Sequence, residues 1–570
     1  LRDQARVYID TVDPKNASVL LQKALRLSDG TDDIQSTARL YELLAENKLN
    51  AGKPDEAEEY QRRAEAIRQE GHSAGQLHAR VLIRTGQLQE ARKELELKAE
   101  EERNQPVHTS RSHRETLLLL SLIYGLQGDV ALSLEAALSG TQRGEELDSP
   151  WVTAVGYMRQ GHALMLLQEE QAYPRAKDAF EKAIEISRFL STPRLRVEAY
   201  WGLCRVYGYS GDLDQATQLA QRAIKIADDA GDTWIASLVR LAMGASLVQA
   251  QSYEIAEDWL NEAFRGFIDC SDPLGASAVR LWTSLGLLSE NDLERLSQEV
   301  PRLMETCQAN QYDFLFTKPT ILGLPDKRAS IPLLIQARDN NWGPSYARQL
   351  LSELNAPGIS IHPGYQLRVE SLGKFQVWRG KQPIPSNGWQ RTKSRQLFQL
   401  LITNHDSPLD REQIFEFLWP GASLNKTEQN FKVTLSTLYR VLEPNRTPGS
   451  ESAYIERKDC SYNIRRDADI WIDFIDFEQS LLTAASFRSQ SPEEAISLLE
   501  RSLQLYKGDF LPDSLYEIWS AAKRELLSVL FLRGADHLCE LYLDNNRPDE
   551  TITTCQRIFE EDNCWERAYR

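Results

Sequence analysis

The chain of 570 residues has a net charge of −17 and an isoelectric point near 5.2. That length allows three or more domains, and the acidic average argues against nucleic-acid binding by the chain as a whole. The seven cysteines form no Cys-x-x-Cys pair and have no histidine partner at metal-ligand spacing, so we expect no metal, no disulfide framework and a cytoplasmic location. No apolar run approaches the ~20 residues of a membrane helix.

Residues 1–305 show a recurring helix break that is followed five positions later by alanine or serine. The breaks lie 34 to 43 residues apart, at Gly52, Gly86, Gly128, Gln171, Gly211 and Gln251. This period, with small residues that let paired helices approach closely, resembles the tetratricopeptide repeat in a longer form. Tyr200, Leu203 and Tyr207 match that family's pattern best. We expect an α-solenoid whose concave surface senses a ligand or binds a partner, with a passive spacer as the alternative.

Residues 306–365 are predicted to be a helical transition that ends in a linker. Two apolar stretches, 313–316 and 333–337, still have the character of helical or buried segments. Residues 355–365 are rich in proline, glycine and asparagine, which favour turns. We therefore place the linker at 355–365.

Residues 366–466 are predicted to form a winged helix-turn-helix. Short strands are expected at 367–371, 375–378 and 382–384, helices at 393–403, 409–418 and 424–442, and a hairpin at 453–457 and 461–465. This segment holds 16 Lys or Arg and 10 Asp or Glu, a net charge of +6, which leaves −23 for the rest of the chain. Its positive charge suits a nucleic-acid partner.

The helix at 424–442 is predicted to be the one that reads DNA. Its apolar face carries Phe431, Leu435, Leu438 and Leu442. The opposite face carries Gln429, Val433, Ser436, Thr437 and Arg440, with Lys432 and Tyr439 on its shoulder. A face with hydroxyls, a small apolar group and cations but no acid suits the major groove, where base edges are read and phosphates are held. The alternative is an ordinary surface face of a helical-repeat element.

Five segments together resemble the OmpR-type winged helix of the SARP antibiotic-regulator family: LRVESLGKFQVWRGKQPIP, KSRQLFQLL, LDREQIFEFLWP, NFKVTLSTLYRVLEP and YIERKDCSYNI. In that family an all-helical bacterial transcriptional activator domain follows, and here helical patterns continue at 473–484, 492–506, 514–544 and 548–561. The resemblance implies a mainly α protein with a tetratricopeptide-like α-solenoid, then a winged helix with a small β-sheet and wing, then an all-α activator domain at 467–570.

The resemblance also implies roles for individual residues. The positions of the family's reading helix that face the bases are matched by Val433, Thr434, Ser436 and Thr437. The positions that face the DNA backbone are matched by Lys432, Tyr439 and Arg440. The wing is matched by Arg457, Lys458 and Asn463. The wing turn lacks the glycine usual in the family, and serine and threonine stand at Ser436 and Thr437 where arginine is frequent. The operator sequence therefore does not carry over.

The partners implied by the resemblance are duplex DNA with tandem half-sites, bound by a homodimer, and RNA polymerase. The polymerase contact would lie in the turn at Trp419, with Ala422 and Ser423 at its rim. The competing interpretation of Trp419 is that it covers the hydrophobic core over Phe415 and Leu418.

An enzyme would need a catalytic constellation, and the sequence shows none. There is no phosphate-binding G-x-x-x-x-G-K-[ST] loop, G-x-G-x-x-G turn or H-E-x-x-H pair. Residues 71–75, GHSAG, match the G-x-S-x-G nucleophile elbow, but a helical pattern precedes them where that elbow needs a strand, so we expect an inter-helix turn. We expect no catalytic residue and no cofactor.

These patterns predict a DNA-binding transcriptional regulator, an activator, in which the repeat domain senses a signal or binds a partner. The alternative is a non-enzymatic interaction scaffold whose winged helix binds protein. A shallow salt dependence of binding would favour the scaffold.

Overall fold

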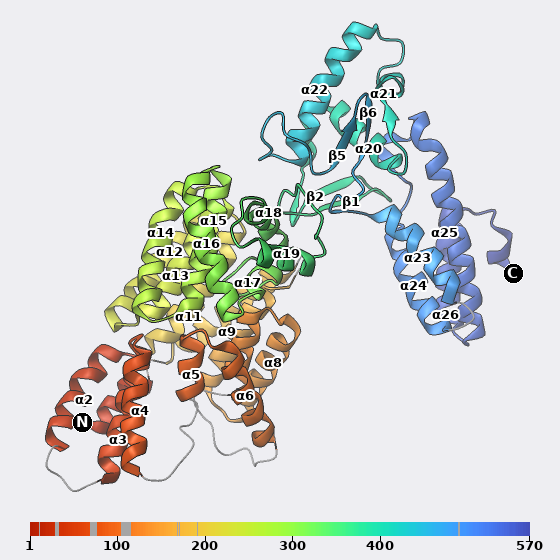
Figure 1. The fold of residues 1–570 in the computed structure, drawn as a ribbon. Coiled ribbons are helices and arrows are strands. Elements are labelled where there is room, and N and C mark those ends of the chain that lie inside the picture. Colours follow the sequence, from red (N-terminus) through yellow and green to blue (C-terminus); the bar gives the residue numbers. More distant parts are fainter. Residues whose placement is uncertain are drawn as a thin grey trace. The chain divides into compact units, whose positions relative to one another are not determined.

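The computed structural model describes residues 1–10, 12–28, 34–68, 77–103, 116–167, 169, 171–190, 192–487 and 491–570. The chain divides into two compact units, Leu1–Pro357 and Gly358–Arg570 (Figure 1). It is mainly α-helical, with a helical-repeat solenoid followed by small β-sheets and an all-α region, which confirms the predicted fold class. Within the described ranges, no helix is long and apolar enough to cross a membrane.

The first unit is built of helices that pack against their neighbours in the chain. They are α1 (Arg2–Asp10), α2 (Pro14–Ser28), α3 (Ile34–Asn50), α4 (Pro54–Arg68), α5 (Leu77–Arg84), α6 (Leu88–Arg103), α7 (Thr116–Gln127), α8 (Val130–Glu146), α9 (Pro150–Leu164), α10 (Ala172–Ser187), α11 (Pro193–Tyr209), α12 (Leu213–Ala230), α13 (Thr233–Gln249), α14 (Tyr253–Asp269), α15 (Pro273–Ser289), α16 (Leu293–Asn310), α17 (Phe314–Thr317), α18 (Ile331–Asp339) and α19 (Pro344–Glu353), with a 3₁₀ turn η1 (Lys327–Ser330) before α18.

The predicted helix breaks correspond to turns in the left-handed backbone region. Gly52, Gly86, Gly128 and Gly211 have φ between 74° and 89°, a conformation that favours glycine. Gln251 adopts it with φ 59°, whereas Gln171 has φ −88° and does not. The alanines five positions after Gly52, Gly86 and Gly211 are completely buried, so the small residue marks the place where the second helix of each pair meets the first.

The first unit extends past residue 305, where we had expected the repeats to end. Tyr312 donates its hydroxyl to the Gly86 carbonyl at 3.2 Å, and the Ile321 amide donates to the Gly125 carbonyl at 3.0 Å. The Lys318 ammonium lies 2.7 Å from the Asp129 carboxylate. The stretch we expected to be a transition therefore packs against turns of the second and third repeats.

A buried ionic network connects several repeats of the solenoid. Arg159 on α9 pairs with Glu198 on α11, and Arg194, also on α11, pairs with Asp232 just before α13. The Arg194 Nε also lies 3.7 Å from Glu198. The Arg84 guanidinium of α5 stacks 3.8 Å from the centre of the Trp234 ring. Charges buried in this way hold a stable arrangement only as long as every partner is present.

The buried Asp272 makes the free energy of unfolding of this unit depend on pH. Its carboxylate accepts hydrogen bonds from the Gly275 amide at 2.9 Å and the Trp234 indole at 2.8 Å, and burial raises its pKa from 3.8 to about 6. The folded chain therefore holds a proton that the unfolded chain has already released. This group makes the fold less stable as pH rises from about 4 to about 6, by about 3 kcal/mol at most.

Replacing this carboxyl with a neutral amide removes this pH dependence. We expect the Asp272→Asn midpoint of thermal unfolding to change less between pH 4.5 and pH 6.5 than the wild-type midpoint does, because asparagine does not titrate. Melting both proteins at the two pH values checks the expectation. Equal changes in the two proteins would mean that Asp272 is ionised over the whole range.

The second unit combines two small sheets with helices. Its elements are β1 (Leu367–Glu370), β2 (Gln376–Arg379), β3 (Gln382–Pro383), η2 (Ser386–Trp389), α20 (Thr392–Thr403), β4 (Leu409–Asp410), α21 (Arg411–Leu418), α22 (Leu424–Leu442), β5 (Ile455–Lys458), β6 (Ser461–Ile464), β7 (Ile470–Ile472), α23 (Asp473–Phe487), α24 (Pro492–Leu505), η3 (Pro512–Ser514), α25 (Ile518–Asp544), α26 (Pro548–Glu561) and η4 (Glu566–Tyr569). The helices α20, α21 and α22 and the β5–β6 hairpin follow one another in the order expected for a winged helix-turn-helix, and we refer to them as the winged-helix region, with the hairpin as its wing (Figure 1).

The N-terminal sheet contains a strand that we did not expect. Its order is β3-β2-β1-β7, and β7, which follows the wing, pairs in parallel with β1. The buried Asp473 at the end of β7 accepts hydrogen bonds from the Ser371 amide at 2.6 Å and the Leu372 amide at 2.9 Å. Asp473 is also the first residue of α23. Its carboxylate therefore connects the end of β1 to the first helix of the all-α region.

One hydrophobic core serves both parts of this unit. Phe398 of α20, Phe474 of α23 and Phe510 after α24 are completely buried in the same cluster, and the Phe474 and Phe510 rings lie 5.2 Å apart. The Ser514 hydroxyl donates to the Gln399 side-chain oxygen at 3.1 Å. The winged helix and the all-α region therefore fold as one body.

Candidate nucleic-acid interface

The exposed face of α22 carries cations and small side chains but no acid. From the first turn of the helix to its end, the exposed residues after position 425 are Lys426, Gln429, Lys432, Val433, Ser436 and Arg440. The nearest carboxylate on the helix, Glu428, is half-buried and lies 3.5 Å from Arg411. Val433 exposes 42% of its surface, which places an apolar side chain on this face.

Thr434 and Thr437 do not belong to this face, and their assignment as base-facing residues was wrong. Their exposed fractions are 2% and 1%, and the Thr437 hydroxyl donates to the Val433 carbonyl at 2.8 Å within the helix. The buried stripe runs through Phe431, Thr434 and Leu438, whereas Leu435 is only half-buried. Thr437 can pack inward because its hydroxyl is satisfied by its own helix.

Tyr439 is also less accessible than a phosphate-contacting residue would be. It is half-buried, burial raises the pKa of its hydroxyl, and the Arg446 guanidinium lies 4.3 Å from the centre of its ring. Arg446 in turn donates to the carbonyls of Ser450 and, at 3.3 Å, Glu451, which holds it beside Tyr439 near the end of the helix. We did not predict a role for Arg446. The only feature of the sequence that could have indicated one is its position as a cation in the loop directly after the helix.

The wing presents two exposed cations at its tip. Lys458 is exposed with its ammonium 2.9 Å from Glu456, and Arg457 donates to the Asp459 carbonyl at 3.2 Å. Asp459 has φ 54° and takes the left-handed position that glycine fills more often. Asn463 is half-buried, and its side-chain oxygen accepts the Ile464 amide at 2.9 Å. The exposed cations of the wing are therefore Arg457 and Lys458, each with one partner inside the wing, and the half-buried Asn463 is engaged with backbone.

Two contacts fix the wing relative to α22. The Tyr462 ring on β6 packs edge-on against Phe431 of the helix at 5.1 Å. Glu443, buried at the helix end, accepts hydrogen bonds from the Ser452 hydroxyl and, at 2.8 Å, from the Ala453 amide at the start of the wing. Burial raises the pKa of the Glu443 carboxyl. These contacts hold α22 and the wing at one fixed spacing.

The turn between α21 and α22 has a half-buried side and an exposed side. Trp419 packs edge-on against Phe415 at 6.4 Å, in agreement with the interpretation that it covers the core. Gly421 has φ 73° and turns the chain, after which Ala422 and Ser423 are exposed. The rim, but not the tryptophan, is free for a partner.

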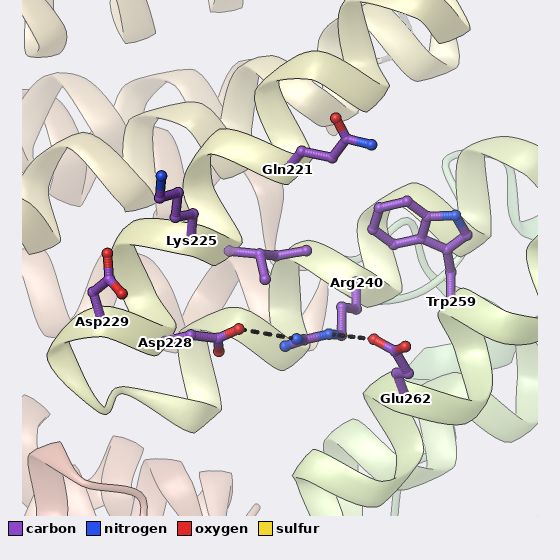
Figure 2. Close-up of a pocket in the computed structure, with 8 residues that line it drawn as sticks. Gln221, Lys225, Asp228, Asp229, Arg240, Trp259 and Glu262 are labelled. Atoms are coloured by element: carbon purple, nitrogen blue, oxygen red, sulfur yellow. Dashed lines mark hydrogen bonds and ion pairs between the residues drawn. The ribbon is translucent and has the colours of Figure 1, made fainter.

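A groove of about 440 Å³ on the first unit is lined by residues of α12, α13 and α14. Figure 2 shows Arg240 lying between Asp228 and Glu262, at 3.3 and 2.9 Å, with the Trp259 indole nearby. The one arginine of the groove is therefore engaged with carboxylates on both sides. The described part of the chain contains no cluster of ligands for a metal. The GHSAG segment lies outside the described residues.

Comparison with known proteins gives one family match. The family of the bacterial transcriptional activator domain matches residues 472–570, which are α23 to η4. The chain thus carries an activator-type domain of bacterial transcription regulators directly after its two small sheets. Among curated proteins, none matches the chain.

Solved structures match the chain at low similarity. A Rap protein complexed with competence and sporulation factor is 12% identical, with a TM-score of 0.43 over 62% of this chain and 95% of that chain. The apo form of RapI is 14% identical, with a TM-score of 0.32 over 62% and 96%. A human IFIT1 dimer with m7Gppp-AAAA is 12% identical, with a TM-score of 0.26 over 97% and 94%. Similarity at this level does not assign a function to the solenoid.

Proposed function

We propose that the chain is a sequence-specific DNA-binding transcriptional activator of the cytoplasm. The observation that carries the proposal is the acid-free exposed face of α22, which holds Lys432, Val433, Ser436 and Arg440 in front of a rigidly attached wing. Cations on such a face bind phosphates, and the small side chains between them can approach base edges and thymine methyls. The matched activator domain supports the same function.

In this proposal the DNA-contacting set differs from the set first predicted. Direct base contacts come from Val433 and Ser436, and phosphate contacts from Lys432 and Arg440 together with Arg446 at the helix end. The wing adds phosphate contacts through Arg457 and Lys458. We further propose that two copies bind tandem half-sites and that the solenoid senses a ligand or a protein partner.

The experiment that tests the proposal is selection of bound duplexes from a random pool by the full chain. We expect one recurring motif, repeated in tandem, to be enriched. A variant with Lys432 and Arg440 both changed to alanine is the control, and it should enrich nothing. Enrichment of no motif by the wild-type chain would favour the scaffold alternative, in which the winged helix binds protein.

The exposed rim of the turn before α22 is the proposed contact with RNA polymerase. We expect Ala422→Gln to lower transcription activation while DNA affinity and the unfolding temperature stay unchanged, because Ala422 is exposed and apart from the reading face. Ala485→Gln, at an exposed alanine of α23, is the matched control. A reconstituted transcription assay gives the readout, and normal activation by Ala422→Gln would exclude the rim.

A further inference from the structure

Two thiols meet where the last two long helices of the chain pack together. The Sγ atom of Cys539 on α25 lies 3.7 Å from the Sγ atom of Cys555 on α26. Cys539 is buried, and its sulfur is also 3.8 Å from the Thr551 carbonyl, one turn before Cys555 on the same helix. Cys555 is partly exposed. Two sulfur atoms already in contact can reach bonding distance through small side-chain rotations.

We propose that Cys539 and Cys555 are a redox modification site that forms a reversible intramolecular disulfide in response to hydroperoxides. The Cys555 thiolate attacks the peroxide, the O–O bond breaks, and a sulfenic acid and an alcohol are formed, or water when the oxidant is hydrogen peroxide. Cys539 then attacks the sulfenic sulfur and releases water. The two thiols lose two electrons in total, and these reduce the peroxide.

The surroundings of the two sulfurs set this order of events. Cys555 is the one that solvent reaches, so it meets the oxidant first. Burial raises the pKa of the Cys539 thiol, which keeps it protonated and protected until a sulfenic acid forms beside it. The remaining cysteines form no such pair in the described residues: Cys204, Cys270 and Cys307 are buried, and Cys460 and Cys564 are exposed.

The disulfide would add a covalent tie to a helix that is otherwise held by side chains. Arg557 of α26 donates to the carbonyls of Leu503 at 2.9 Å and Tyr506 at 3.1 Å, and the Ser528 hydroxyl of α25 donates to Glu561 at 2.8 Å. Oxidation closes the loop between residues 539 and 555, which restricts the unfolded chain. It should therefore raise the unfolding temperature of this unit by several degrees.

The test exposes the full chain to a small excess of hydrogen peroxide, then denatures it and alkylates free thiols for mass spectrometry. The untreated chain should take seven labels, one for each cysteine. The oxidised chain should take two fewer, a 539–555 linked peptide should be found, and dithiothreitol should restore all seven. Seven labels after oxidation, or a sulfinic acid at Cys555 without the linked peptide, would overturn the proposal.

Serine variants separate this site from general oxidation. Cys539→Ser and Cys555→Ser should each abolish the linked peptide and the rise in unfolding temperature. Cys460→Ser and Cys564→Ser, at the two exposed cysteines, should keep both. An oxidised wild-type chain that melts no higher than the reduced one would contradict a disulfide formed within the native packing.

Discussion

Asp473→Ala should destabilise the second unit by about 3 to 5 kcal/mol. The carboxylate is 2% exposed and accepts the amides of Ser371 and Leu372 as well as the Ser371 hydroxyl, so its removal leaves buried donors without partners. Each orphaned donor costs about 1 to 3 kcal/mol. The loss of stability should affect the winged-helix region and the all-α region together, because Asp473 connects the end of β1 to α23.

Denaturant unfolding of the full chain, followed by tryptophan fluorescence, measures this effect. Asp467→Ala is the matched control, since Asp467 pairs with Arg465 at the surface and should contribute about 1 kcal/mol or less. A small effect of Asp473→Ala, equal to that of the control, would show that the junction between the two parts does not depend on this carboxylate.

Substitutions on the exposed face of α22 should separate affinity from specificity. Arg440→Ala should weaken binding to all duplexes by a similar factor, because a phosphate contact carries no sequence information. Val433→Ala and Ser436→Ala should instead change the preference at one or two base pairs, by about 1 to 3 kcal/mol if the contact is good. Binding to the selected motif and to random duplexes gives the comparison.

The control for this series is Gln479→Ala, a substitution at an exposed position on α23. It should change neither the DNA affinity nor the base-pair preference. Thr437→Ser keeps the buried hydroxyl and should leave the base preference unchanged, since the side chain does not reach the DNA. Equal effects of Arg440→Ala, Val433→Ala and Ser436→Ala on both kinds of duplex would show that another surface carries the base contacts.

Helices and turns could be predicted where the pattern that identifies them lies within a few residues of the chain. Turn glycines with a small residue five positions later identified the repeats, because the positive φ and the helix contact both depend on residues close together in the chain. The polar face of α22 was mostly correct for the same reason. The prediction was wrong for Thr434 and Thr437, which are both buried; Thr437 can pack inward because its hydroxyl bonds to its own helix.

Features that depend on distant residues could not be predicted in this way. The pairing of β7 with β1 joins Ile470 to Leu367, and the Tyr312 bond to Gly86 crosses 226 residues. Nothing in either short segment identifies its partner. We placed a boundary at residue 305 and expected no strand at 470–472 because both predictions used local composition. Local composition carries no information on long-range contacts.

The salt dependence of binding to the selected duplex tests the central claim most directly. If Lys432, Arg440, Arg446 and the two wing cations neutralise phosphates, the affinity of the full chain should fall steeply with salt, with a log-log slope of roughly −3 to −5. Each alanine substitution among them should make the slope shallower by about one. A nearly salt-independent affinity, unchanged by Arg440→Ala, would contradict the claim that this face of α22 binds DNA.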